Sequence, residues 1–311
     1  MELRQLRYFV AVAEELNFTR AAARLQMAQP PLSRQIQKLE AEIGIQLFRR
    51  DRGKVSLTDA GHVLLEEASG VLAQAAHAID SARRAHDGKT GLIRIGIAWG
   101  LGDKVSRVLG RHSRQFPNVE IECKDVASTP QNEALRLRTI DVGFMRPPID
   151  SEHLVSERLF DEKFLVVLSI SNPLAKRKTL RLKQLANEPL LLIERNVSSG
   201  TFDKTLELYR KADVHPKIIQ TRSLPYEEAG AILVASGKGI YIAIGTNPCH
   251  PRFADGVTVV PLAEPDAKFD VHMAWRRDES SISVLGFLDT VREVFKPGNS
   301  NGSVRKRMKR G

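Results

Sequence analysis

The hydrophobic residues of this chain change their spacing once, near residue 90. Before that point they recur every three or four residues, the period of an amphipathic helix, with one interruption around residue 50. After it, alternating runs such as Ile93, Ile95 and Ile97 are interleaved with helical patterns. A chain of 311 residues is long enough for two or three folded units. The sequence therefore predicts a helical N-terminal part, followed by an α/β part with a mostly parallel sheet.

Two predicted helices near the N-terminus are separated by a short turn. The first, about residues 18–25, is capped by Asn17 or Thr19 and contains three consecutive alanines that let another helix approach closely. The second opens with two prolines, which are tolerated in a first helical turn, and is expected to end near Gly44. One face of this second helix is apolar. The opposite face, flanked by Ser33, carries Pro30, Arg34, Gln37 and Lys38. The pattern predicts a helix-turn-helix whose second helix enters the major groove of DNA, where Arg pairs with guanine and Gln with adenine.

Two short strands, residues 46–49 and 54–57, are predicted directly after this helix. Arg49, Arg50 and Arg52 lie at the tip of the hairpin, where they can reach phosphates or a narrow minor groove. Taken singly, each element also fits a plainer interpretation, in which polar side chains keep a helix face or a hairpin in water. The order of helix, turn, helix and wing favours a winged helix-turn-helix that binds double-stranded DNA, over residues 1–58.

A long linker helix is predicted over residues 59–89. Apolar residues recur along it at alternating spacings of three and four, the repeat of a two-helix seam. The residues of this repeat are Leu65, Ala68, Leu72, Ala75, Ile79 and Ala82. The repeat predicts dimerisation through this helix, which would place two recognition helices one or more DNA turns apart. The alternative is a helix that packs along its own domain.

Three loops of the α/β part follow predicted strands and lead into predicted helices. Ligands of open α/β sheets bind at the carboxyl ends of strands, where helix N-termini offer free amide donors. Hydroxyl groups in these loops suit a carboxylate, and a charged hydrogen bond can come from Arg146, directly after a strand. The predicted small-molecule site comprises Trp99, Gly100, Leu101, Ser128, Thr129, Arg146, Ser199, Phe202 and Thr246. Helix capping is the alternative for each hydroxyl, and a core position is the alternative for Trp99.

The net charge of +10 is unevenly distributed. Residues 296–311 hold six Lys and Arg and no Asp or Glu, so most of the excess belongs to this end of the chain. We expect residues 297–311 to form a basic, disordered tail. Overall charge alone is therefore weak evidence for a nucleic-acid partner, and the case for DNA depends on the first sixty residues.

Other classes of protein are excluded by what the sequence lacks. Its longest apolar runs are strand-sized and its N-terminus does not resemble a secretory signal, so we expect no membrane association and a cytoplasmic location. Two cysteines, Cys123 and Cys249, build neither a disulfide framework nor a metal site. The motifs GxGxxG, GxxxxGK[ST] and GxSxG are missing, so we expect neither an enzyme nor a cofactor. A solute-binding protein is a further alternative, which an export signal would favour.

Three stretches in the first 61 residues resemble the DNA-binding domain of the LysR-type transcriptional regulators: MELRQLRYFVAVAEELNFTRAAARL, QPPLSRQIQKLEAEIGIQLFRR and LTDAG. Further along, IRIG at residues 93–96, IDVGF at 140–144 and VREVF at 291–295 resemble the effector domain of the same family. The order of segments is nearest to the branch that answers to benzoate, muconate and similar acids. The chain departs from the family at Trp99 and Gly100, where relatives often carry a small hydroxyl residue.

The resemblance implies a two-lobed Rossmann-like effector domain of the type 2 periplasmic-binding-protein kind over residues 90–296. Lobe I would comprise residues 90–160 and 268–296, and lobe II residues 161–267. An aromatic or dicarboxylic acid in the cleft would modulate the binding and bending of promoter DNA by a homotetramer, assembled as a dimer of dimers. Residue by residue, the resemblance implies major-groove contacts from Gln29, Pro30, Pro31, Ser33 and Arg34, and wing contacts from Arg50 and Arg52.

Overall fold

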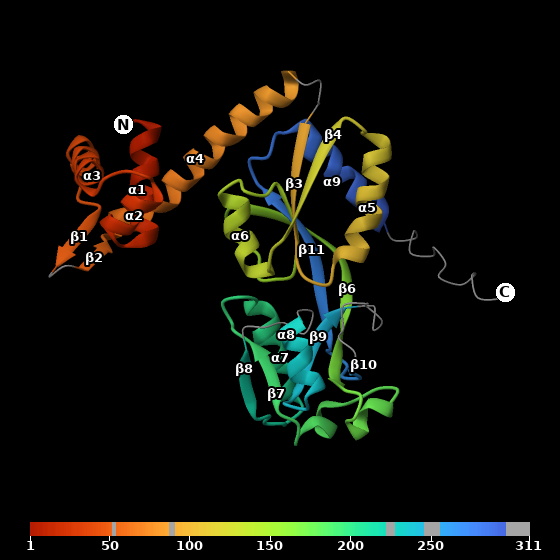
Figure 1. Ribbon diagram of the computed structural model, residues 1–311. Coiled ribbons are helices and arrows are strands. Elements are labelled where there is room, and N and C mark those ends of the chain that lie inside the picture. The colour runs from red at the N-terminus through yellow and green to blue at the C-terminus, as the bar shows by residue number, and fades with distance from the viewer. Residues whose placement is uncertain (52–53, 87–90, 222–227, 246–255, 297–311) are drawn as a thin grey trace. The chain divides into compact units, whose positions relative to one another are not determined.

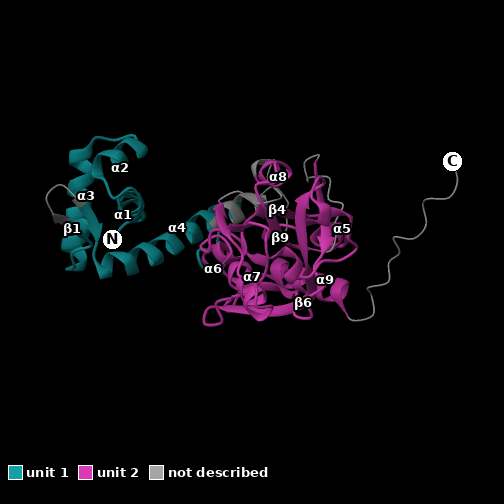
Figure 2. Cartoon of the chain, turned by 90° about the horizontal axis from the view of Figure 1, so that it is seen from below, with its two compact units in different colours: residues 1–88, 136–139 teal, residues 89–135, 140–311 magenta. Residues whose placement is uncertain are grey.

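The computed structural model describes residues 1–51, 54–86, 91–221, 228–245 and 256–296. The chain divides into two compact units, residues 1–88 with 136–139 and residues 89–135 with 140–311 (Figure 2). Unit 1 consists of α1 (Leu3–Glu15), α2 (Phe18–Arg24), α3 (Gln29–Ile43), β1 (Phe48–Asp51), β2 (Lys54–Leu57) and α4 (Asp59–His86) (Figure 1). In the described ranges, no helix is both long and apolar enough to cross a membrane.

The helix boundaries in unit 1 follow from local chemistry. The Asn17 side chain caps α2, because its Oδ1 accepts hydrogen bonds from the N–H groups of Thr19 at 2.9 Å and Arg20 at 3.0 Å. Gly44 ends α3 in the left-handed region, with φ of 72°, which favours glycine. The two strands form an antiparallel hairpin in which Asp51 pairs with Lys54, so the expected hairpin is confirmed with a first strand that begins two residues late.

The first half of unit 2 contains β3 (Gly91–Ile97), α5 (Gly102–Gln115), β4 (Val119–Asp125), α6 (Ser128–Arg136), β5 (Val142–Met145) and β6 (Leu154–Ser169). The second half contains the 3₁₀ helices η1 (Pro173–Lys176) and η2 (Leu182–Leu185), then β7 (Leu190–Ile193), α7 (Ser199–Lys211), β8 (Ile218–Thr221), α8 (Glu228–Ala235), β9 (Ile240–Gly245), β10 (Val257–Pro261), β11 (Lys268–Arg276) and α9 (Ile282–Phe295). The strand order is β4-β3-β5-β11-β6-β9-β7-β8, with β10 paired to β6.

The sheet is mixed, which corrects the expectation of a mostly parallel one. Strand β3 is parallel to β4 and β5, and β7 is parallel to β8 and β9. The long strands β6 and β11 are antiparallel to their neighbours and to each other. β6 has 16 residues, but only its C-terminal half is a continuous apolar run. The apolar run predicts a strand over residues 165–170, so sequence patterning detects the end of β6 and misses its polar beginning.

Unit 2 has two lobes, each with its own core, and β6 and β11 run through both (Figure 1). In lobe I, α5 and α9 pack on one face of β3, β5 and β11, while α6 packs on the other. In lobe II, the alternation of β9 divides two cores: Ile240, Ile242 and Ile244 face the α7 side, and Tyr241 and Ala243 face the α8 side. The carboxyl ends of β3, β5, β7 and β9 border the junction of the two lobes, because Trp99, Arg146, Ile193 and Ile244 at these ends line one pocket.

Candidate functional sites

The exposed face of α3 carries the side chains that the sequence assigned to DNA. Leu32, Ile36 and Leu39 are fully buried in the core of unit 1, which turns the opposite face to solvent. Gln29, Pro30, Pro31, Arg34, Gln37 and Lys38 are exposed, and Ser33 is half-buried. The structure thus presents one helix face with two cations and two amides, a chemistry suited to base edges and phosphates.

The hairpin that follows α3 is fixed to it by Glu40, a residue that the sequence analysis missed. The Glu40 carboxylate is buried and its Oε1 accepts hydrogen bonds from the N–H groups of Leu47 at 2.8 Å and Phe48 at 3.1 Å. This contact sets where β1 begins. At the hairpin, Arg49 is exposed, whereas the side chain of Arg50 and the whole of Arg52 lie outside the described residues.

The predicted seam on α4 is divided in the structure. Leu65 and Leu72 pack against the core of their own unit, and Ala68 is buried in it. This packing agrees with the alternative in which the helix packs along its own domain. Leu65 and Leu72 are only half-buried there, so the seam stays a prediction at these two positions, whereas Ala68 is 1% exposed and packs inside its own unit. Ala75, Ile79 and Ala82 continue the same stripe along α4, and the Ile79 side chain is 52% exposed.

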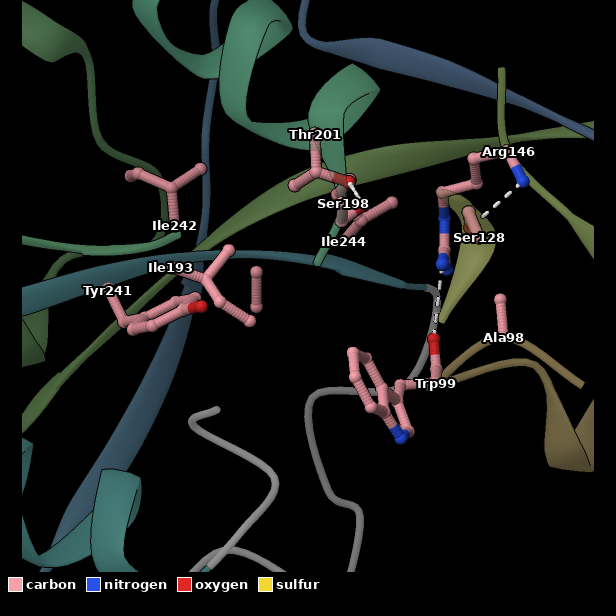
Figure 3. A pocket seen from close by; sticks show the side chains of 11 residues that line it. Ala98, Trp99, Ser128, Arg146, Ile193, Ser198, Thr201, Tyr241, Ile242 and Ile244 are labelled. Atoms are coloured by element: carbon pink, nitrogen blue, oxygen red, sulfur yellow. Dashed lines mark hydrogen bonds between the residues drawn. The ribbon is translucent and has the colours of Figure 1, made fainter. Parts of the chain in front are cut away.

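A pocket opens at the carboxyl ends of the parallel strands in unit 2 (Figure 3). The space between its side chains is about 420 Å³, including the part open to solvent. Its lining residues are Ala98, Trp99, Ser128, Arg146, Ile193, Ser198, Thr201, Tyr241, Ile242, Ala243 and Ile244. The lining is mostly apolar, with a small polar group at the starts of α6 and α7, which is typical of a small-molecule site.

Arg146 does not stand in this pocket as a free cation. Its Nη2 donates to Oε2 of Glu162 at 2.5 Å, and both side chains are almost completely buried. Its Nη1 donates to the carbonyl of Trp99 at 3.1 Å, and its backbone N–H donates to the hydroxyl of Ser128 at 3.1 Å (Figure 3). The expected charged hydrogen bond to a ligand therefore competes with an ion pair inside the chain. Glu162 was missed because nothing in the sequence around it shows that its carboxylate is buried and paired with Arg146.

Several predicted pocket residues have other positions. Leu101 is fully buried in the core of lobe I and Phe202 packs against the core of lobe II, so their apolar side chains stabilise the lobes and do not line the pocket. Gly100 is exposed, with φ of 86°. Thr246 lies outside the described residues.

The two remaining predicted residues, Thr129 and Ser199, contact each other across the lobes. The Ser199 N–H donates to Oγ1 of Thr129 at 3.0 Å, and the two hydroxyl oxygens are 3.1 Å apart. The adjacent Ser198 and Thr201 line the pocket instead, and the Ser198 hydroxyl donates to Thr201 at 2.9 Å.

The apolar wall formed by Ile193 and the β9 residues was also missed as a site. The sequence contains a signal for this wall, since residues 240–244 form an apolar run typical of a buried strand. The residues Tyr241, Ile242, Ala243 and Ile244 end that run at the edge of the sheet where ligands bind. The described residues contain one surface group with metal-ligand chemistry, Asp150, Glu152 and His153, and its His153 ring lies 2.9 Å from the Asp150 carboxylate.

Comparisons with known proteins match both units. The family model for the bacterial regulatory helix-turn-helix protein, lysR family, matches residues 3–62, and the model for the LysR substrate binding domain matches residues 86–296. The regulator BenM of Acinetobacter baylyi is 34% identical over 300 residues, which cover 95% of this chain and 96% of BenM. The uncharacterized regulator YnfL of Escherichia coli is 34% identical over 290 residues, covering 92% and 96%.

Solved structures agree with these sequence matches. CbnR, a LysR family transcriptional regulator, is similar with a TM-score of 0.72 and 26% identity, covering 96% of this chain and 100% of CbnR. Full-length CbnR complexed with its target DNA is similar with a TM-score of 0.69 and 26% identity, covering 94% and 99%. Because the two family models together span the helix-turn-helix and the two-lobed unit, the chain belongs to the LysR family of bacterial transcriptional regulators.

Proposed function

We propose that this LysR-family regulator recognises promoter DNA through the exposed face of α3 and the hairpin beside it. The observation that carries the proposal is the separation of faces on α3: a fully buried apolar face and an opposite face with Arg34, Gln37 and Lys38. Arg and Gln donate to the base edges of guanine and adenine, while Lys neutralises phosphate. The match of residues 3–62 to the helix-turn-helix family model and the similarity of the chain to CbnR in complex with its target DNA support this proposal.

We further propose that the pocket of unit 2 binds the effector. Trp99 and the β9 wall offer apolar surface to a ring, and the hydroxyls of Ser128 and Thr201 offer polar contacts at the starts of two helices. Helix N-termini favour negative charge, so an aromatic or dicarboxylic acid remains the ligand class that we propose. The preference would come from these helix ends, because the charge of Arg146 is compensated by Glu162.

The proposed assembly is a homo-oligomer, a dimer of dimers, in which the exposed part of the α4 stripe contacts a second copy. Ala75, Ile79 and Ala82 carry this proposal, because an isoleucine that is 52% exposed on a long helix is stabilised by burial against a partner. We also propose a cytoplasmic protein with no catalytic turnover, since the proteins to which it is similar are named as transcriptional regulators.

The decisive experiment for the DNA proposal is a footprint of the full chain on the DNA upstream of its own gene. We expect protection of two spaced half-sites, because dimeric readers contact successive turns of one DNA face. Arg34→Ala is expected to cost about 1–3 kcal/mol of discrimination at the base that it reads. Arg4→Ala, at an exposed position on α1, is the matched control and should leave base preference intact. Uniform, salt-sensitive coating of the DNA would contradict the proposal.

The effector proposal is tested by thermal shift of the full chain with benzoate and with its neutral analogue benzamide. A ligand at 100 times its dissociation constant adds about 2.7 kcal/mol to stability. We expect a saturable shift with the acid that is reduced in Thr201→Val, and unchanged in Ser106→Ala, whose hydroxyl lies at an exposed position on α5. An equal shift with benzamide would contradict the preference for an acid.

A further inference from the structure

The first turns of α6 and α7 meet across the two lobes. Thr129, the second residue of α6, accepts the N–H of Ser199, the first residue of α7, at 3.0 Å. The N-terminal end of a helix carries a partial positive charge from N–H groups that have no partner within the helix. Two helix N-termini repel each other because both carry partial positive charge. A hydrogen bond between them therefore requires an acceptor group at one of the two ends. The Thr129 hydroxyl supplies that acceptor from the chain itself.

The next residue of α7, Gly200, makes the contact closer than any other amino acid allows. A Cβ built on Gly200 would lie 1.8 Å from the carbonyl oxygen of Pro147 and 2.8 Å from its carbonyl carbon. Pro147 follows β5 in lobe I, whereas Gly200 is the second residue of α7 in lobe II. The atom that blocks the Cβ is backbone, which cannot rotate away as a flexible side chain would. Glycine at this position therefore permits the two lobes to touch backbone to backbone.

On the lobe I side of this contact, α6 and the segment that follows β5 are joined to each other by hydrogen bonds. The Asn132 side chain, on α6, donates to the carbonyl of Pro148 at 3.2 Å and accepts the N–H of Asp150 at 2.9 Å. These bonds tie the segment after β5 to α6. On the lobe II side, α7 is fixed in its own core by Leu208 and Tyr209. Thr129 and Pro147 thus present one surface, and Ser199 and Gly200 dock on it from the other lobe.

We propose that the contacts Thr129–Ser199 and Pro147–Gly200 form an interlobe latch, which holds the lobes closed beside the pocket through the chain's own atoms. The latch borders the proposed effector site, because Ser128, Ser198 and Thr201 are lining residues that flank it in sequence. This inference rests on the proposed function where it concerns the effector. A ligand shifts the equilibrium between closed and open lobes only by the difference between its affinities for the two arrangements. The latch determines how much of the protein is closed before the ligand binds.

The test measures the distance between the lobes in the full chain. Spin labels are attached through Glu133→Cys on α6 and Arg210→Cys on α7, both exposed positions, in a background with Cys123→Ser and Cys249→Ser. Excess unlabelled protein dilutes the labels, so that distances within one chain dominate. Double electron–electron resonance then gives the distance distribution for the parent, for Gly200→Ala and for a matched control, Gly110→Ala. At Gly110 the nearest atom to an added Cβ is a side-chain nitrogen at 3.7 Å, so the control has room.

We expect Gly200→Ala to shift the distribution to longer distances, because the added Cβ must move from 1.8 Å to beyond 3.0 Å from the Pro147 oxygen. Gly110→Ala should match the parent. Thr129→Val, which keeps the shape and removes the acceptor, should add a second population at longer distance, and it decides the matter if Gly200→Ala does not fold. Parent-like distributions in both latch variants would overturn the proposal.

Footprints with the same samples separate this inference from the proposed function. If the variants retain parent-like distances while the parent protects its DNA, the latch is wrong and the DNA proposal stands. If the distances shift while the parent protects no specific DNA, the latch stands and the DNA proposal is wrong.

Discussion

Arg146 and Glu162 form an ion pair with side chains that are 6% and 0% exposed, and Glu162 lies on β6, one of the two strands that pass through both lobes. Removing one member of a buried pair leaves the other charge uncompensated, which costs about 3–5 kcal/mol. We therefore expect Glu162→Ala to lower the thermal midpoint of the full chain strongly. Glu157→Ala is the control: it lies on the same strand but pairs with Arg292 at a half-exposed site, where such pairs contribute about 0–1 kcal/mol. Equal losses in the two variants would show that burial of the pair is not what matters.

The carboxylate of Glu40 joins α3 to the hairpin, so we expect its removal to weaken the proposed DNA binding as well as to lower stability. Glu40→Ala leaves the buried N–H groups of Leu47 and Phe48 without their acceptor, at a cost of about 1–3 kcal/mol. We expect weaker half-site protection at temperatures where the variant is still folded. Glu42→Ala, on the exposed side of the same helix, should bind DNA like the parent in a titration by fluorescence anisotropy.

Stability should fall in mildly acidic solution because of His112. Burial lowers the pKa of His112 below its ordinary value of 6.5, and its ring contacts Thr290, Phe116 and Phe287. The unfolded chain therefore binds a proton that the folded chain does not, and the free energy of unfolding decreases as pH falls from about 6.5 toward the lowered pKa.

The measurement is the thermal midpoint as a function of pH for the parent and His112→Gln. One proton corresponds to at most about 1.4 kcal/mol per pH unit. Burial also lowers the pKa of His272. We therefore expect His112→Gln to lose part of the dependence of the thermal midpoint on pH and to keep the part that comes from His272. If the thermal midpoint of His112→Gln depended on pH as that of the parent does, His112 would not be the source of the loss of stability in acid.

The basic tail lies outside the described residues, and its role stays a prediction. Deletion of residues 297–311 removes five of the six cations between 296 and 311. We expect weaker nonspecific DNA binding and a smaller dependence of affinity on salt, by about 0.9 in log–log slope for each phosphate that the tail no longer neutralises. Half-site choice should persist, because a cationic run binds phosphates and not base edges. An unaltered slope would place the tail away from DNA.

Sequence patterning was sufficient where a structure depends on neighbours along the chain. The buried face of α3, the cap at Asn17 and the helix end at Gly44 are local features, and the structure confirms each of them. A pocket also opens at the carboxyl ends of the parallel strands, where the order of the elements alone placed the ligand site, and that it binds an effector stays a prediction.

The features that sequence patterning missed depend on contacts between different elements of the fold, or on the burial of a side chain. The periodicity of the sequence shows neither. Glu40 and Glu162 are acidic residues in helix and strand patterns, and nothing local distinguishes a buried carboxylate from a solvated one. Leu65 and Leu72 fit a two-helix seam and a single domain's core equally well, because both require the same spacing. Leu101 stands in a pocket loop by sequence, but its side chain turns into the core of lobe I.

The passage of β6 and β11 through both lobes limits how this protein can be rearranged. Each lobe draws backbone hydrogen bonds from strands that continue into the other, so neither lobe is a separable module. Gene fragments that divide residues 91–296 between two chains would each leave an open sheet edge prone to aggregation. Fusion of the effector-responsive part to a different DNA-binding domain should therefore transfer both lobes together, with the junction placed before β3.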